Sequence, residues 1–289
     1  MGKRSRRRVK PPKEERVPFV ARCFEGLPAE CDWVALREIV PAATAEVTLG
    51  AGAGDDTGRV VRVCTLLPGG VPGLVRDDGA IWLGLQVQHN SADVSRDLAE
   101  VVRNGLQSGP GSTLRPVEST RNSPRLQELI DPDSDFSVQV REGFDFWVED
   151  TDEPAGEAAA GLEAANEAAA PTVKLDSVQA AYWTKMADRR YLRWVLPHPE
   201  NRVLTALARL RTRSEDHLGP DTRLIGMFRA HGLLVPVWEM DAETPAEALE
   251  EPIVALDGRL QEALADDSGL SQYERSAREG LASRQLTIR

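Results

Sequence analysis

The sequence predicts an α+β fold of two similar small domains, each a mainly antiparallel sheet with helices packed on one face, plus C-terminal helices. Three observations lead to this prediction. Segments with strand-like alternation are interspersed with segments whose apolar residues recur every three or four positions. An Ala- and Glu-rich stretch divides these segments into two halves. With 289 residues, 41% of them hydrophobic, the chain can bury two cores of ordinary size.

These observations divide the chain into four parts. We expect a disordered basic tail at 1–16, a first α+β domain at 17–149, an acidic linker at 150–172 and a second α+β domain with the C-terminal helices at 173–289. Like charges and two prolines disfavour packing of the tail. The linker has Leu162 as its one bulky hydrophobic residue, and transient helicity is the alternative interpretation of this stretch.

The first half begins with a predicted helix. Residues 28–40 place Trp33, Leu36 and Ile39 at helical spacing, and Pro41 ends the pattern. The elements expected after it are strands at 46–49, 59–67 and 80–87, a helix from Asn90 or Ser91 to about Asn104, a short helix at 125–130, and a hairpin that pairs 136–140 with 144–148.

The second half has the clearer local signals. Ser271 and Glu274 form a capping-box pattern, so the last helix is expected to begin there. The elements expected before it are a hairpin of 181–186 with 191–196, a helix at about 200–213, a short helix at 223–231, a strand at 233–238, and a helix at 245–265 capped by Thr244.

The two halves align with each other when the chain is shifted by 109 residues. An internal duplication is one interpretation of this match, and two unrelated hairpin-helix units that share a few identities are the other. The aligned pairs include Leu83 with Leu192, His89 with His198, Val94 with Val203, and Leu98 with Leu207.

The strongest functional signal is the division of charge along the chain. The first sixteen residues carry +6 while the whole chain is −11, which leaves −17 on the remainder. A short polycation attached to an acidic body predicts contact with a polyanion, such as RNA, the ribosome or DNA, through the tail. Its basic residues are Lys3, Arg4, Arg6, Arg7, Arg8, Lys10, Lys13 and Arg16.

Composition also argues against several classes of protein. No apolar stretch reaches the eighteen or so residues of a membrane span, and the arginines at 6–8 are followed by prolines and charges where an export signal would have an apolar run. We therefore expect a cytoplasmic protein without membrane contact. Cys23, Cys31 and Cys64 have unrelated spacings and form no CxxC pair, so we expect neither a disulfide framework nor a metal site.

Several segments together resemble a known family. They are 17–22 (VPFVAR), 24–28 (FEGLP), 33–44 (WVALREIVPAAT), 143–147 (GFDFW) and 191–198 (YLRWVLPH). This set is similar to an actinobacterial protein family of unknown function whose members also begin with a basic tail, and the similarity covers about residues 1–240. The resemblance implies no chemistry.

Some members of that family carry the names topoisomerase or preprotein translocase, and the motifs of this chain support neither. A translocase motor needs a GxxxxGK[ST] phosphate loop, whereas the only lysines after the tail, Lys174 and Lys185, do not follow glycine. Tyr182, Tyr191 and Tyr273 have no recognisable nucleophile context. The glycine-rich segment 50–58 fails GxGxxG spacing and precedes a strand pattern, so we predict a hairpin loop and no nucleotide cofactor.

The candidates for a catalytic base are His89 and His198, at corresponding strand-to-helix junctions. The alternative, which we favour, is that each ends its strand and packs at a turn, because no serine or cysteine nucleophile pattern accompanies them. His217 and His231 are interpreted as structural or exposed.

Tryptophans and arginines could together form a base-stacking platform, but we expect core packing and a solvated helix face instead. The tryptophans on expected strands are Trp82, Trp147, Trp183, Trp194 and Trp238. The arginines of the one folded basic cluster are Arg189, Arg190, Arg193, Arg202, Arg209, Arg211 and Arg213.

We therefore hypothesise a non-enzymatic cytoplasmic binding or adaptor protein that engages nucleic acid or the ribosome through its tail. One alternative is an enzyme of unrecognised type with its site between the two halves, around His89 or His198. The other is a protein-interaction scaffold. No cofactor is expected under the leading hypothesis.

Overall fold

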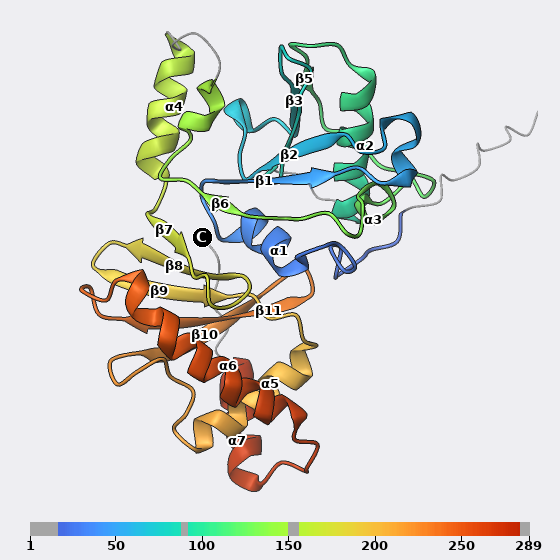
Figure 1. Ribbon diagram of the computed structural model, residues 1–289. Helices are drawn as coiled ribbons and strands as arrows, with labels where there is room; N and C mark the ends of the chain where they lie inside the picture. The colour runs from blue at the N-terminus through green and yellow to red at the C-terminus, as the bar shows by residue number, and fades with distance from the viewer. Residues whose placement is uncertain (1–16, 88–91, 150–155, 284–289) are drawn as a thin grey trace, which may run out of the picture.

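The computed structural model describes residues 17–87, 92–149 and 156–283, and it confirms the predicted α+β class. Two sheets lie on opposite sides of the first helix, and each sheet has further helices on its far side (Figure 1). The basic tail, His89 and the proposed caps Asn90 and Ser91 fall outside the described residues.

The first sheet has six strands in the order β5-β3-β4-β2-β1-β6, and all neighbours are antiparallel except the parallel pair β2 and β4. Successive side chains of a strand point to opposite faces of the sheet, so on β1 Ala45 and Val47 point into the core and Glu46 points outward. The strands are β1 (Ala43–Thr48), β2 (Val60–Cys64), β3 (Gly73–Val75), β4 (Ile81–Gly84), β5 (Thr113–Leu114) and β6 (Gln139–Val140).

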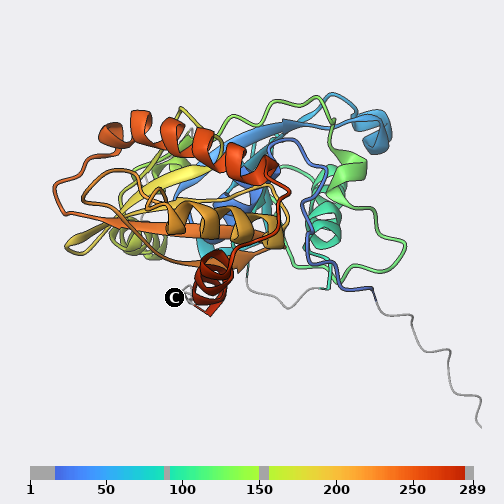
Figure 2. The same cartoon turned by 90° about the horizontal axis from the view of Figure 1, so that it is seen from below.

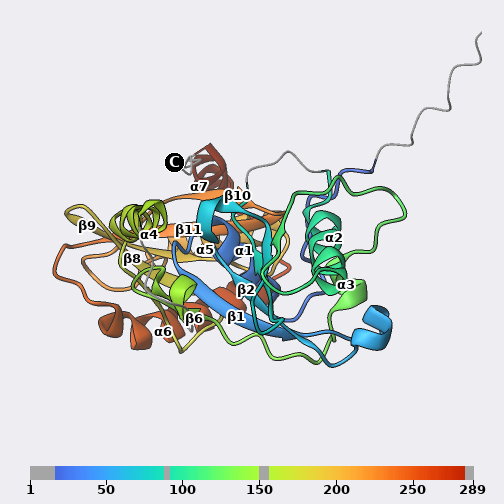
Figure 3. The same cartoon turned by 90° about the horizontal axis from the view of Figure 1, so that it is seen from above.

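Three helices cover the inner face of this sheet: α1 (Glu30–Glu38), α2 (Val94–Gln107) and α3 (Leu126–Leu129). The Asp93 side chain caps α2 by accepting from the backbone N–H of Ser95. Figure 3 shows α2 and α3 on one side of the sheet, away from α4.

The predicted hairpin of 136–140 with 144–148 is wrong. The strand β6 pairs with β1, and the 3₁₀ helix η3 (Asp145–Val148) replaces the second strand. In the 3₁₀ helix, Phe146 and Trp147 are buried against Cys64 and Trp82 on the outer face of the sheet, and this burial of apolar rings favours the helix over a second strand.

The segment expected to be a linker contains a packed helix, α4 (Glu157–Ala168). Leu162 and Ala165 lie against the η3 aromatic cluster, and Asn166 Oδ1 accepts from the backbone N–H of Phe144 at 2.6 Å. Its alanine-rich composition suits a helix, but this docking contact comes from distant residues.

The second sheet has five antiparallel strands in the order β10-β11-β9-β8-β7. The expected hairpin of β8 with β9 is confirmed, whereas the short helix expected at 223–231 is wrong, because these residues form β10. Apolar residues in a short run cannot distinguish a strand from a helix, and pairing with β11 decides the matter. The strands are β7 (Thr172–Lys174), β8 (Ala181–Met186), β9 (Arg189–Trp194), β10 (Arg223–Ala230) and β11 (Leu233–Met240).

One face of the second sheet is covered by α5 (Glu200–Thr212), η4 (Ala246–Leu249), α6 (Glu250–Ala265) and α7 (Gln272–Ser283). In Figure 2, α5 is amber, α6 is orange-red and α7 is dark red. The capping box at the start of α7 is confirmed: the Ser271 N–H donates to Glu274 at 2.7 Å, and the Glu274 N–H donates to Ser271 Oγ at 3.3 Å.

The other face of the second sheet packs toward α1. Tyr182 and Phe228 belong to the same hydrophobic cluster as Trp33 and Leu36 of α1 and Val63 of the first sheet. The helix α1 is therefore shared between the two sheets.

The units β4–α2 and β9–α5 correspond under the 109-residue shift, but their sheet neighbours differ. The strand β4 has a parallel neighbour in β2, whereas both neighbours of β9 are antiparallel. The internal duplication stays a prediction.

Candidate functional site

The outer face of the first sheet is covered over one half and open over the other. The η3 aromatics and α4 cover Cys64 and Trp82, while Glu46, Val60 and Arg62 face outward beyond them. Two adjacent cavities of about 220 and 330 Å³ share Glu46, Val60 and Arg62 as lining residues.

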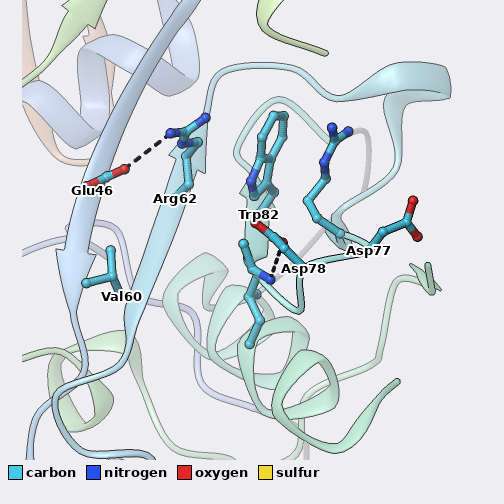
Figure 4. Close-up of a pocket in the computed structure, with 9 residues that line it drawn as sticks. Glu46, Val60, Arg62, Asp77, Asp78 and Trp82 are labelled. Carbon is cyan, nitrogen blue, oxygen red and sulfur yellow. Dashed lines mark hydrogen bonds and ion pairs between the residues drawn. The ribbon is translucent and has the colours of Figure 1, made fainter. Parts of the chain in front are cut away.

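Trp82 lies between two arginines at the centre of this surface (Figure 4). The guanidinium carbons of Arg62 and Arg76 are 5.0 and 4.6 Å from the indole ring. Both distances are within the range of cation–π attraction. Because Trp82 is only 4% exposed, it offers no free ring for a base to stack on.

The charges on this open face are mixed. Arg62 lies 3.4 Å from Glu46 and 3.5 Å from Glu149, and Arg76 donates to the backbone carbonyls of Trp147 and Glu149. No histidine or cysteine lines either cavity, so the face offers ion pairs and hydrogen bonds without an obvious acid–base pair. It is suited to binding a polar partner.

A third cavity, of about 490 Å³, lies where the two sheets approach each other. The end of α1, the residues after β2 and β4, the end of α4, and the β8–β9 hairpin line it. Its polar side chains include Arg37, Glu38, Gln86 and Arg193. We call it the interlobe cavity.

Of the two histidines considered as catalytic candidates, the structure describes only His198. His89 lies outside the described residues, and His198 is not among the residues lining the three cavities. Burial, and next the nearby charge of Arg202, lower the pKa of His198. His217 accepts from the backbone N–H of Gly219 at 3.2 Å, a local turn contact.

His231 has the polar contacts that sequence reasoning missed. Its Nδ1 is 3.1 Å from Cys23 Sγ, and its Nε2 is 2.7 Å from Glu38 Oε1. The pattern of thiol, imidazole and carboxylate is that of a nucleophilic triad, but Cys23 is only 1% exposed and burial raises the pKa of its thiol to about 12. The protonated thiol can donate to Nδ1, so the three residues link α1, the segment before it and the β10–β11 turn.

The local signal for His231 is the dipeptide His231-Gly232 between two apolar segments, which is typical of a tight hairpin turn. Both residues have positive φ, 45° and 78°. Gly232 is a local signal for this turn, although a helix was expected up to residue 231; the contact with Cys23, 208 positions away, has no local signal.

The interpretation of the second-half arginines as a solvated helix face is wrong for Arg209, which is 2% exposed. Arg209 donates to the backbone carbonyls of Ala263, Asp266 and Ser268. It thereby supplies hydrogen bonds to carbonyl groups at the C-terminal end of α6, which lack donors within the helix. Arg193 is separate from Arg209 and lines the interlobe cavity.

Five of the six tryptophans are buried, as expected for core packing. Trp82, Trp183, Trp194 and Trp238 are on strands as predicted, whereas Trp147 is in η3. Within 17–87, 92–149 and 156–283, no group of three His, Cys, Asp or Glu side chains could hold a metal ion. In the same ranges, no helix is long and apolar enough to cross a membrane.

A model of a family of unknown function, DUF5926, matches residues 23–289. The chain belongs to this family. The DUF5926 match includes both sheets and the three cavities, and it begins after the basic tail. Comparisons with curated proteins and with solved structures find no match.

Proposed function

We propose that this DUF5926 protein is a non-enzymatic binding or adaptor protein whose basic tail contacts the phosphates of RNA, the ribosome or DNA. The observation that supports the proposal is the charge division, +6 on residues 1–16 against −17 on the rest. Eight basic residues within sixteen can neutralise several phosphates, and counterion release then supplies affinity without sequence selectivity.

Among the residues that the structure describes, the open outer face of the first sheet carries mixed charge. The two cavities of the outer face combine three arginines with four acidic residues. Affinity for a polyanion would therefore come from the tail, while the open face could hold a second, polar partner, as an adaptor requires. The arginines are Arg62, Arg76 and Arg141, and the acidic residues are Glu46, Asp77, Asp78 and Asp135.

A salt titration of nucleic-acid binding tests the tail. If all eight basic residues meet phosphates, the full chain should lose affinity for duplex DNA with a log-log slope of about −7. Deleting residues 1–16 should abolish binding in a filter-binding assay with duplex DNA or RNA.

The matched control is the double variant Arg62→Gln and Arg76→Gln, which removes two positive charges from the body and none from the tail. Its salt slope should equal that of the unmodified chain. Equal binding with and without the tail, or no binding by either protein, would refute the proposal.

The enzyme alternative, with a site between the two halves around His89 or His198, stays a prediction, because His198 is not among the residues that line the interlobe cavity. The scaffold alternative rests on the open polar face. A pull-down from native extract with and without nuclease distinguishes the scaffold from the nucleic-acid adaptor, because only the adaptor's partners would be released by the nuclease.

A further inference from the structure

The interlobe cavity contains two partly buried arginines with few protein partners. The Arg37 side chain is 9% exposed, and its Nη1 donates to the carbonyl of Leu85. Arg193 Nη2 donates to Thr184 Oγ1 at 2.5 Å. Each guanidinium has five N–H donors, so a single hydrogen bond from each leaves most of this capacity unused among the described residues.

The Nε atoms of both arginines are inaccessible to solvent and lack a hydrogen-bond partner within the described chain. Burial lowers the pKa of Arg193 to about 10 and also lowers the pKa of Arg37. A buried cation without a counterion is costly, and an anion bound beside it would offset that cost.

The nearest carboxylate does not neutralise the pair. Glu38 Oε1 is 3.6 Å from Arg37 Nε but also 2.7 Å from His231 Nε2. Among the described residues no acidic side chain forms an ion pair with Arg193. The buried Asp97 carboxylate also interacts electrostatically with Arg37 and, together with Glu38, offsets its charge. The charge without a counterion among the described residues is therefore that of Arg193, and a charge of about +1 matches a monoanion.

The rest of the lining is mixed, with apolar side chains beside Glu38, Gln86 and Thr184. Ile39, Val40, Val87 and Met186 line the cavity beside the arginines. Its volume of about 490 Å³ is within the usual range of small-molecule pockets. A ligand with an anionic head and an apolar body would satisfy both parts of this lining.

We propose that the interlobe cavity binds a small organic monocarboxylate, whose carboxylate pairs with Arg37 and Arg193 and whose apolar part contacts the hydrophobic walls. The guanidinium fork matches a carboxylate with two parallel hydrogen bonds. Because the lining comes from α1, the end of α4 and the β8–β9 hairpin, the ligand would bridge the two sheets. The proposal is independent of the tail.

Isothermal titration calorimetry of the full chain with hexanoate and benzoate tests this site, with hexanamide as the neutral counterpart of hexanoate. We expect binding of the carboxylates and none of hexanamide. Arg193→Gln should weaken carboxylate binding about tenfold or more, because a charge-assisted pair is lost. Arg189→Gln is the matched control, since Arg189 lies on the same strand with a side chain 57% exposed.

A second variant keeps the test valid if Arg193→Gln does not fold. Ala168 is exposed at the end of α4 and lines the cavity, so Ala168→Trp should fill it while circular dichroism stays unchanged. This variant should lose hexanoate binding.

Four results would overturn the proposal: no binding of either carboxylate, equal binding of hexanamide, full binding by a folded Arg193→Gln protein, or unchanged binding by Ala168→Trp. Tighter binding of phenyl phosphate than of benzoate would overturn the assignment to carboxylates.

Discussion

At the scale of single residues, a buried polar contact joins α1 to the second sheet. Asp32 is buried on α1, where it accepts from Tyr182 Oη at 2.5 Å and lies 3.0 Å from Lys174 Nζ. Burial, with the neighbouring Asp32 carboxylate, raises the pKa of Tyr182 well above 10. The phenol therefore remains a donor throughout the physiological pH range.

Replacing Tyr182 with phenylalanine should lower the free energy of unfolding by about 1–3 kcal/mol at pH 7, because Asp32 loses a buried donor. Above pH 10 the unfolded phenol deprotonates while the native one keeps its proton, so the unmodified protein loses about 1.4 kcal/mol per pH unit through this group. The difference in unfolding free energy between the unmodified protein and Tyr182→Phe should therefore become smaller above pH 10. Urea unfolding at pH 7 to 11 measures this difference.

Tyr273→Phe is the control for this prediction, because Tyr273 is a largely exposed residue of α7. Its unfolding free energy should differ little from that of the unmodified chain. A Tyr182→Phe protein as stable as this control would show that the contact with Asp32 contributes nothing.

At the scale of elements, the glycine-rich loop between β1 and β2 was predicted as a hairpin loop, but its packing against α3 was not predicted. The segment 50–58 is the predicted hairpin loop, and it contains the 3₁₀ helix η1 (Ala51–Asp56). Gly52 packs so closely on α3 that a Cβ atom there would lie 1.7 Å from the carbonyl oxygen of Glu128. The loop is a packed element, and glycine permits the close approach.

Gly52→Ala should destabilise the protein by roughly 2 kcal/mol or more, since backbone must shift to relieve the overlap. Gly161→Ala is the matched substitution, because Gly161 lies within α4 and a Cβ there would meet no atom within 4 Å. It should stabilise the protein by about 0.5–1 kcal/mol through helix propensity. The midpoint temperature of thermal unfolding should fall for Gly52→Ala and rise for Gly161→Ala. Equal shifts of the two midpoints would contradict the packing of η1 on α3.

At the scale of the whole molecule, α1 joins the two sheets through a single hydrophobic cluster. Trp33 of α1 stacks on Phe136 at 4.5 Å, and Tyr182, Val195 and Val235 of the second half belong to the same cluster. Separating the halves would expose to water the face of α1 that packs against the second sheet.

We therefore expect differential scanning calorimetry of the full chain to show one unfolding transition. Gly52→Ala, which is confined to the first half, should lower the midpoint of that whole transition. Two resolved transitions, of which Gly52→Ala moves only one, would show that the halves unfold independently.

Local signals predicted much of the fold. Apolar spacing correctly placed α1 and α5, the β8–β9 hairpin followed from two short strand patterns, and the capping box marked the start of α7. The failures were short or weakly patterned segments, namely 144–148 and 223–231, together with the unexpected docking of α4. The contacts of 144–148 and of α4 come from residues far away in sequence, whereas 223–231 pairs with the next strand, β11.

The sequence by itself determined the fold class, the division of charge between tail and body, and most helices and strands, because these depend on composition and on neighbours a few positions apart. Only the tertiary structure decided which residues meet: Trp82 between two arginines, His231 beside Cys23, and Arg37 with Arg193 in one cavity. Such contacts depend on how the two sheets pack around α1, and no local pattern encodes that packing.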